Sequence, residues 1–126
     1  MFPAMDDPNT REAPAGSPGF SDDPDIQYDS RLAHFIRLLS DDDEVSRWKA
    51  AEALGRLKDP AAVDELIDTL WDEDARVRIK AAWALGQIGD MRAFAPLQRL
   101  YRMENETAQE IITEALETIR AGMSRQ

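Results

Sequence analysis

Histidine and cysteine, two residue types common in catalytic sites, are scarce in this chain, which has one histidine, His34, and no cysteine. A Cys–His pair is therefore excluded, and no Ser–His–Asp set is indicated. The acidic runs at 41–44 and 72–74 lack the central glycine and the 12-residue loop of a calcium site. We expect these acids to cap helices. The sequence predicts no catalytic residue, no cofactor and no bound metal, and hence a protein that is not an enzyme.

Charge and hydropathy restrict the partners of the chain. The net charge is −10, which disfavours nonspecific binding to nucleic acids and anionic membranes. No apolar run approaches the roughly 20 residues that span a bilayer. The first residues lack the basic and apolar regions of a signal peptide. We therefore expect a cytoplasmic protein whose partners include neither nucleic acid nor membrane.

Charged side chains recur every 31 residues, at Arg37, Asp68 and Arg99. In stacked helical units these positions would lie roughly 10 Å apart, the distance between packed helices. One interpretation is an alternating charge ladder, in which each exposed ion pair contributes roughly 0–1 kcal/mol. The other is the polar part of a surface that binds an unidentified protein. The remaining residues predicted for that surface are His34, Asp64, Glu65, Arg92, Arg102 and Trp71.

An internal repeat of 31 residues organises the chain. When Asp43–Glu73 is aligned with Asp74–Glu104, 12 of 31 positions are identical. A repeat of this length is typical of stacked supersecondary units. We predict an all-α fold, a short α-solenoid (α–α superhelix) of about three helical hairpins, over residues 30–126. Its units are about 30–42, 43–73, 74–104 and 105–121.

Apolar periodicity and capping residues place six helices. The first begins after a cap at Asp29 or Ser30. Asp59 followed by Pro60 is a helix start signal, and Gly122 is expected to end the last helix. Tyr101 is assigned to the apolar face of its helix. The predicted helices cover about 30–40, 44–57, 60–70, 75–88, 91–103 and 106–121.

Residues 1–29 differ in composition from the rest of the chain. They hold five of the seven prolines and seven acids against one base. Few apolar residues are available to offset the entropy of ordering, so we predict a disordered acidic arm. It is either a solubilising arm or a segment that uses Phe20, Ile26 and Tyr28. Those side chains would dock on the open end of the stack or form a linear motif for another protein.

Several residues at equivalent repeat positions favour a structural role. Arg47 and Arg78 are one such pair, and Asp59 and Asp90 are another. We predict an ion pair between Asp59 and Arg78, and no equivalent ionic partner for Asp90 because the third copy has Gln109. Gly55 and Gly86 are expected to permit close packing near the turn; neither precedes the Lys-Ser/Thr of a phosphate-binding loop.

The three tryptophans are the best indication of a partner. Trp71 is predicted in the turn between units, whereas Trp48 and Trp83 lie outside the apolar stripes. Tryptophan is enriched at interface hot spots. The alternative is that the rings fill space between repeats.

The segment 77–90 reads V-R-I-K-A-A-W-A-L-G-Q-I-G-D. It resembles the short HEAT-like repeat of phycobilisome bilin lyases, V-R-x-x-A-A-x-A-L-G-x-I-G-D. Residues 46–59 match this pattern with small departures, and 106–119 keep only Ala115, Leu116 and Ile119. The resemblance covers about residues 30–121. It implies an α-solenoid whose second helices line the concave side.

The same resemblance implies function. Proteins of this type bind other proteins, often as adaptors or assembly factors, and we expect this role through the concave face of helices 30–40, 60–70 and 90–103. One alternative is a subunit of a cofactor or chromophore lyase, with an apolar groove near Trp71. Another is a structural repeat protein that forms homo-oligomers through the open ends of the solenoid.

Overall fold

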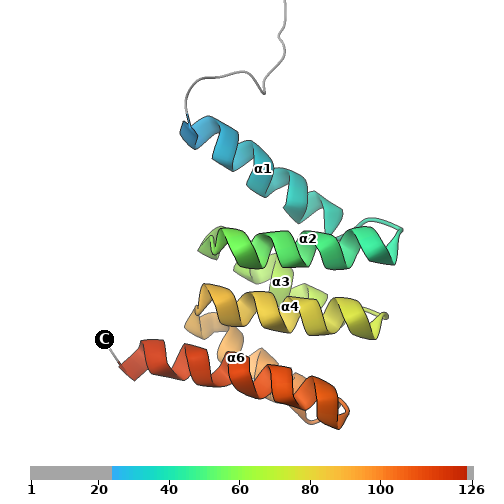
Figure 1. Ribbon diagram of the computed structural model, residues 1–126, viewed down its shortest axis with the longest axis vertical. Helices are drawn as coiled ribbons and strands as arrows, with labels where there is room; N and C mark the ends of the chain where they lie inside the picture. Colours follow the sequence, from blue (N-terminus) through green and yellow to red (C-terminus); the bar gives the residue numbers. More distant parts are fainter. Residues whose placement is uncertain (1–23, 125–126) are drawn as a thin grey trace, which may run out of the picture. The chain divides into compact units, whose positions relative to one another are not determined.

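The computed structural model describes residues 24–124, and all regular structure in this range is helical (Figure 1). The all-α prediction is therefore confirmed. The chain divides into two units between Ala33 and His34, within helix α1 (Pro24–Leu38). The second unit contains the remaining elements: α2 (Glu44–Leu57), η2 (Pro60–Ala62), α3 (Val63–Thr69), α4 (Ala75–Ile88), η3 (Met91–Ala93), α5 (Phe94–Tyr101) and α6 (Glu106–Ser124).

Helices α2 and α4 have the bounds that the sequence predicts. The Asp43 carboxylate accepts a hydrogen bond from the Ser46 amide at 3.2 Å, and the Asp74 carboxylate accepts one from the Arg76 amide at 2.8 Å. Side-chain caps of this kind satisfy free amides at helix starts. Both helices end on a residue in the left-handed region, Lys58 at φ 55° and Gly89 at φ 77°. Their lengths are thus set by local side-chain and backbone chemistry.

The second helix of each hairpin begins with a 3₁₀ turn, which the sequence did not predict. Asp59 accepts from the Ala61 amide, and Asp90 accepts from the Arg92 amide, both at 2.9 Å. The turns η2 and η3 follow these caps and lead directly into α3 and α5. The predicted helices at 60–70 and 91–103 are therefore each composed of a 3₁₀ turn and a shorter α-helix.

Two predicted helix ends are wrong. Helix α1 begins at Pro24 rather than Ser30, since proline is well suited to a first helical turn. Helix α6 continues past Gly122 to Ser124, because a glycine that keeps a helical φ near a helix end costs only about 1 kcal/mol relative to alanine. Of the arm predicted for residues 1–29, residues 1–23 lie outside the described part of the chain. The predictions for Phe20 and for the side chains of Ile26 and Tyr28 also fall outside what the structure describes.

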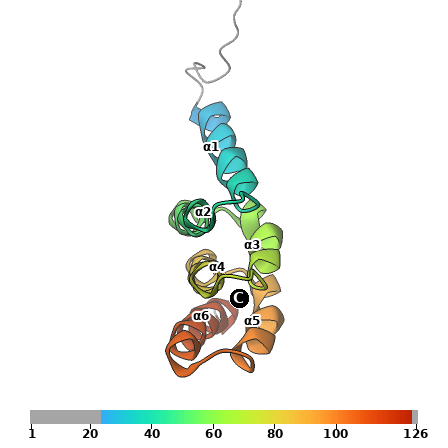
Figure 2. The same ribbon diagram turned by 90° about the vertical axis from the view of Figure 1, so that its right-hand side faces the viewer.

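Within the second unit the helices form two layers (Figure 2). Helices α2, α4 and α6 lie side by side in one layer, while α3 and α5 form the other. Helix α4 packs against α2, α3 and α6, and α5 packs against α6. Fully buried leucines, isoleucines and valines fill the space between the layers: Leu54, Val63, Leu66, Leu70, Val77, Leu85, Leu97, Ile112 and Ile119.

The first-layer helices approach one another through glycine and alanine. A Cβ atom added to Gly86 would lie 2.8 Å from both Cα and Cβ of Ala115 in α6. One added to Gly55 would lie 2.5 Å from Cζ3 of Trp83 and 2.9 Å from Cα of Ala84 in α4. Atoms cannot approach this closely without displacement of the neighbouring backbone. Glycine at these two positions therefore sets the spacing of the layer.

The substitution Gly86→Ala tests this spacing. We expect it to lower the free energy of unfolding by about 1–3 kcal/mol, the usual result of overpacking. The matched control is Gly122→Ala, where an added Cβ meets no atom within 4 Å. This variant should gain about 0.5–1 kcal/mol from helix propensity. Urea unfolding followed by circular dichroism measures both, and a Gly86→Ala variant as stable as wild type contradicts the close contact.

Candidate protein-binding surface

Arg47 lies at the first turn of α2 and joins two turns of the stack. Its side chain is 10% exposed. The guanidinium donates to both carboxylate oxygens of Asp72, with Nε–Oδ2 at 2.9 Å and Nη2–Oδ1 at 3.2 Å. It also donates from Nη1 to the backbone carbonyls of Asp41 and Asp42. The bond to Asp72 raises the pKa of Arg47, and the side chain connects the turn before α2 to the turn before α4.

Arg78 repeats this arrangement one unit further along. Its Nε donates to Oε2 of Glu104 at 2.6 Å, and its Nη1 donates to the carbonyls of Asp72 and Glu73. Glu104 is 7% exposed in this contact. Bidentate or multiply bonded arginines hold carboxylates and carbonyls with strict geometry. The two arginine side chains are therefore paired within the chain, and we do not assign them to a binding surface.

The predicted ion pair between Asp59 and Arg78 is wrong. Arg78 is near the start of α4, whereas Asp59 follows the end of α2. Because α2 and α4 run side by side in the same direction (Figure 1), the two residues lie at opposite ends of helices about 20 Å long. The prediction that Asp90 lacks an ionic partner is also wrong, since Arg92 Nη2 lies 2.9 Å from Asp90 Oδ2.

Every residue predicted for the partner-binding surface has an exposed side chain. The exposed residues are His34, Arg37, Asp64, Glu65, Asp68, Trp71, Arg92, Arg99 and Arg102. They come from the end of α1, from α3 and its following turn, from η3, and from α5 and its C-cap. We refer to these nine residues as the second-helix surface.

The alternating charge ladder is absent from this surface. The side chains of Arg37, Asp68 and Arg99 form no ion pair or hydrogen bond with any residue between 24 and 124. A ladder would immobilise each long side chain across the distance between two helices. An exposed ion pair adds only about 0–1 kcal/mol of stability, which does not favour that arrangement. Their charges are therefore available to another molecule.

Two members of the second-helix surface, Arg92 and Asp64, connect neighbouring repeats. Arg92 Nη1 lies 3.4 Å from Oδ1 of Asp64 in α3. Its Nη2 also donates to the carbonyl of Pro60 at 3.2 Å. Arg92 thus joins η3 to the preceding hairpin, which the 31-residue register did not indicate because the pair is 28 residues apart.

A groove of about 200 Å³ adjoins the unpaired charge of Asp68. It lies between the end of α1 and α3, and Thr69 at its base donates to the Glu65 carbonyl at 2.7 Å. The lining is mixed, with Ile36 and Leu39 supplying apolar area beside carboxylates. The complete lining is Ile36, Leu39, Ser40, Glu65, Asp68, Thr69 and Asp72.

The tryptophans divide into two kinds. Trp71, directly after α3, is 43% exposed. Trp48 and Trp83 are half-buried and flank Lys80, whose Nζ lies 5.6 Å and 5.4 Å from the two ring centroids. This cation–π contact joins α2 to α4. Trp71 is therefore the exposed tryptophan, whereas the other two contact the neighbouring helix.

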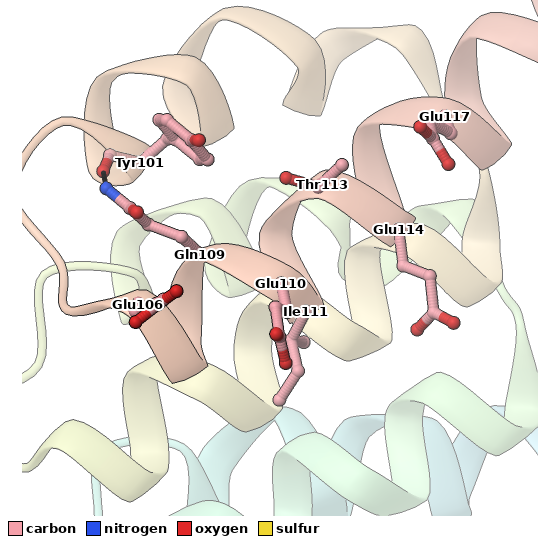
Figure 3. Close-up of a pocket in the computed structure, with 8 residues that line it drawn as sticks. All are labelled: Tyr101, Glu106, Gln109, Glu110, Ile111, Thr113, Glu114 and Glu117. Carbon is pink, nitrogen blue, oxygen red and sulfur yellow. Dashed lines mark hydrogen bonds between the residues drawn. The ribbon is translucent and has the colours of Figure 1, made fainter.

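Sequence reasoning named the open ends of the stack but missed an acidic surface on α6. An open groove of about 570 Å³ runs along this helix. It is lined by Tyr101 and by residues of α6: Glu106, Gln109, Glu110, Ile111, Thr113, Glu114 and Glu117 (Figure 3). Tyr101, which the sequence placed on an apolar face, is 39% exposed. The spacing of the four glutamates, one per helical turn, was the signal available in the sequence.

No group of three or more His, Cys, Asp or Glu side chains within residues 24–124 is arranged to hold a metal ion. In the same range, every helix is too short or too polar to cross a membrane.

Comparison with known proteins identifies the repeat. A family model described as HEAT repeats matches residues 32–117. The chain belongs to the HEAT-repeat family. HEAT repeats are commonly protein-interaction modules and are generally not catalytic. The phycobilisome-lyase type of HEAT-like repeat stays a prediction, and no curated protein matches the sequence.

Stability of this HEAT-repeat stack should depend on pH through Asp90. The hydrogen bond from Arg92 lowers the pKa of the Asp90 carboxyl below its usual 3.8. A group with a lowered folded-state pKa stabilises the fold above its unfolded pKa and loses this contribution as the pH falls through the folded value. We expect Asp90→Asn, which keeps a capping oxygen, to be less stable than wild type at pH 7.

The two proteins should converge in stability as the pH falls through the lowered pKa of Asp90, where this carboxyl becomes protonated. Urea unfolding at pH 7, 5, 4 and 3 measures the difference. A constant difference between Asp90→Asn and wild type across this range contradicts a role for the ionised carboxylate.

Proposed function

We propose that this HEAT-repeat protein is a non-catalytic adaptor or assembly factor that binds another protein through its second-helix surface. The observation that supports this most strongly is the lack of an internal ion pair at Arg37, Asp68 and Arg99. All three are exposed, occupy equivalent repeat positions and have no ionic partner among the described residues. Other arginines of the stack, Arg47 and Arg78, are bound within it.

The order of charges on this surface defines a complementary partner. Positive, negative and positive groups follow one another from α1 to α3 to α5, so a partner segment would present acidic, basic and acidic groups in turn. Arginine binds carboxylates with two parallel hydrogen bonds, which adds geometric specificity. Complementary charge of this kind steers association and suppresses wrong partners.

Apolar contacts would supply the remaining affinity. Trp71 offers a large exposed ring at the end of α3, and Ile36 and Leu39 line the groove beside Asp68. Interfaces typically derive most of their binding energy from a few such aromatic anchors, and surrounding polar groups contribute specificity. Trp71 would be the aromatic anchor, and the charges of the second-helix surface beside the groove would contribute specificity.

The two alternatives derive less support from the geometry. A lyase subunit would need an apolar groove near Trp71, whereas the groove lined by Thr69 and Asp72, on either side of Trp71 in the sequence, also contains the carboxylates of Glu65 and Asp68. Homo-oligomers formed through α6 would bring the exposed carboxylates of two copies together, and like charges at an interface oppose association.

Affinity capture from an extract of the source cells tests the proposal. The bait is the full chain, either as wild type, as the variant Arg37→Ala/Asp68→Ala/Arg99→Ala, or as the control Lys49→Ala/Lys58→Ala/Glu73→Ala. The control removes two cations and one anion, as the test variant does, from exposed positions elsewhere. Circular dichroism establishes that all three baits remain helical.

A partner retained by wild type and control but reduced about tenfold or more by the test variant supports the proposal, since hot-spot residues commonly contribute this much. Equal retention by all three baits contradicts it. Mass spectrometry of the captured proteins provides the readout.

A further inference from the structure

We propose that the uncovered end of the stack, formed by α5 and α6, is a second docking surface that binds a basic amphipathic helix of a partner protein. The argument rests on the repeat register, on the apolar pocket at the α5–α6 seam, and on the charge around it. It shares Arg102 with the second-helix surface and otherwise rests on different residues.

The repeat register shows which positions of α6 correspond to those that α2 and α4 bury against the next repeat. Ala51 and Ala82 are fully buried against the next repeat, and their equivalent in α6 is the exposed Thr113. Gly55 and Gly86 are buried in the same way, and their equivalent is the exposed Glu117. The side of α6 that carries these residues is therefore the side on which another helix would pack.

Two apolar residues at this end are uncovered although their counterparts are buried. Leu116 is half-buried, whereas the equivalent Leu54 and Leu85 are fully buried. Tyr101 is 39% exposed, whereas the equivalent Leu70 is fully buried. An end that served only as a solvated cap would be expected to carry polar residues here.

These residues form an apolar pocket. It has a volume of about 270 Å³, lies at the seam between α5 and α6, and is lined by Gln98, Tyr101, Arg102, Thr113 and Leu116. The Tyr101 ring lies beside Gln109 and Thr113, and Gln109 Nε2 donates to the Tyr101 carbonyl at 2.8 Å (Figure 3). This hydrogen bond fixes the end of α5 against α6, so the pocket is preformed for an apolar side chain.

Charge identifies the class of partner. Glu106, Glu110, Glu114 and Glu117 fall within about 80° of the helix circumference, opposite the buried stripe of α6. Their carboxylates form no ion pair with any residue of the described range. Figure 3 shows Glu110 and Glu114 on the same side of the helix. A helix with lysine or arginine on successive turns, lying alongside α6, would match these carboxylates.

The same charge disfavours other occupants. A second copy of this chain carries a net charge of −10, and its residues 1–29 hold seven acids and one base. Both would meet the glutamates of α6 with like charge, which opposes association. A basic helix with an apolar residue for the Tyr101–Leu116 pocket is the occupant that meets both features.

Titration of the full-length ¹⁵N-labelled protein tests this proposal. The probes are a lysine–leucine amphipathic peptide of about 18 residues, or five helical turns, the same peptide with glutamate for lysine, and a peptide of residues 1–23. Amide shifts in the protein's NMR spectrum locate each binding site and give the dissociation constant. Sedimentation at several concentrations reports self-association.

The protein variants are Glu114→Gln/Glu117→Gln, Tyr101→Ser, and the control Asp42→Asn/Glu73→Gln. The control makes the same change of charge at exposed acids far along the sequence from α6. We expect the lysine peptide to shift amides of α5 and α6. Glu114→Gln/Glu117→Gln should weaken it about fivefold or more, and the control less than about twofold.

Several outcomes would overturn the proposal. They are no binding of the lysine peptide, equal binding of the glutamate peptide, shifts centred outside α5 and α6, and unchanged affinity in both test variants. Binding of the peptide of residues 1–23 to α6 would assign the surface to the chain itself. A molecular mass that rises with concentration, and that Tyr101→Ser abolishes, would assign it to a second copy.

Discussion

The close approach of the first-layer helices is the constraint on which the rest of the structure depends. Gly55 and Gly86 lie directly against α4 and α6, where even a methyl group would meet backbone atoms. This spacing brings the turns between repeats near enough for Arg47 to hold Asp72 and for Arg78 to hold Glu104. A hairpin in such a stack buries too little surface alone, so each repeat depends on its neighbours.

The same packing divides the charges of the molecule into two groups. Arginines near the first-layer turns are bonded to carboxylates and carbonyls, and Lys80 lies between Trp48 and Trp83. Arg37 of α1 and the second-layer residues Asp68 and Arg99 form no ion pair within the described range. The first group stabilises the stack, and the second supplies the charges on which the proposed binding of a partner depends.

Much of the fold was predictable because the repeat is explicit in the sequence. The 31-residue register and the caps at Asp43 and Asp74 give α2 and α4 their bounds. Ion pairs were less predictable. The repeat register identifies equivalent positions, but it does not show toward which neighbouring turn a side chain extends. Arg78 therefore pairs with Glu104 rather than Asp59. The exposure of Tyr101 depends on the absence of a following repeat among the described residues, which local periodicity does not encode.

Hydrogen exchange of Gly86→Ala, compared helix by helix with wild type, tests the central claim most directly. The claim is that contact at Gly86 couples α6 to the stack. If it holds, amides of α6 lose the most protection, because the α4–α6 contact is broken, while those of α2 lose the least, because Gly55 still contacts α4. An exchange pattern identical to wild type, or a loss centred on α2, would contradict it.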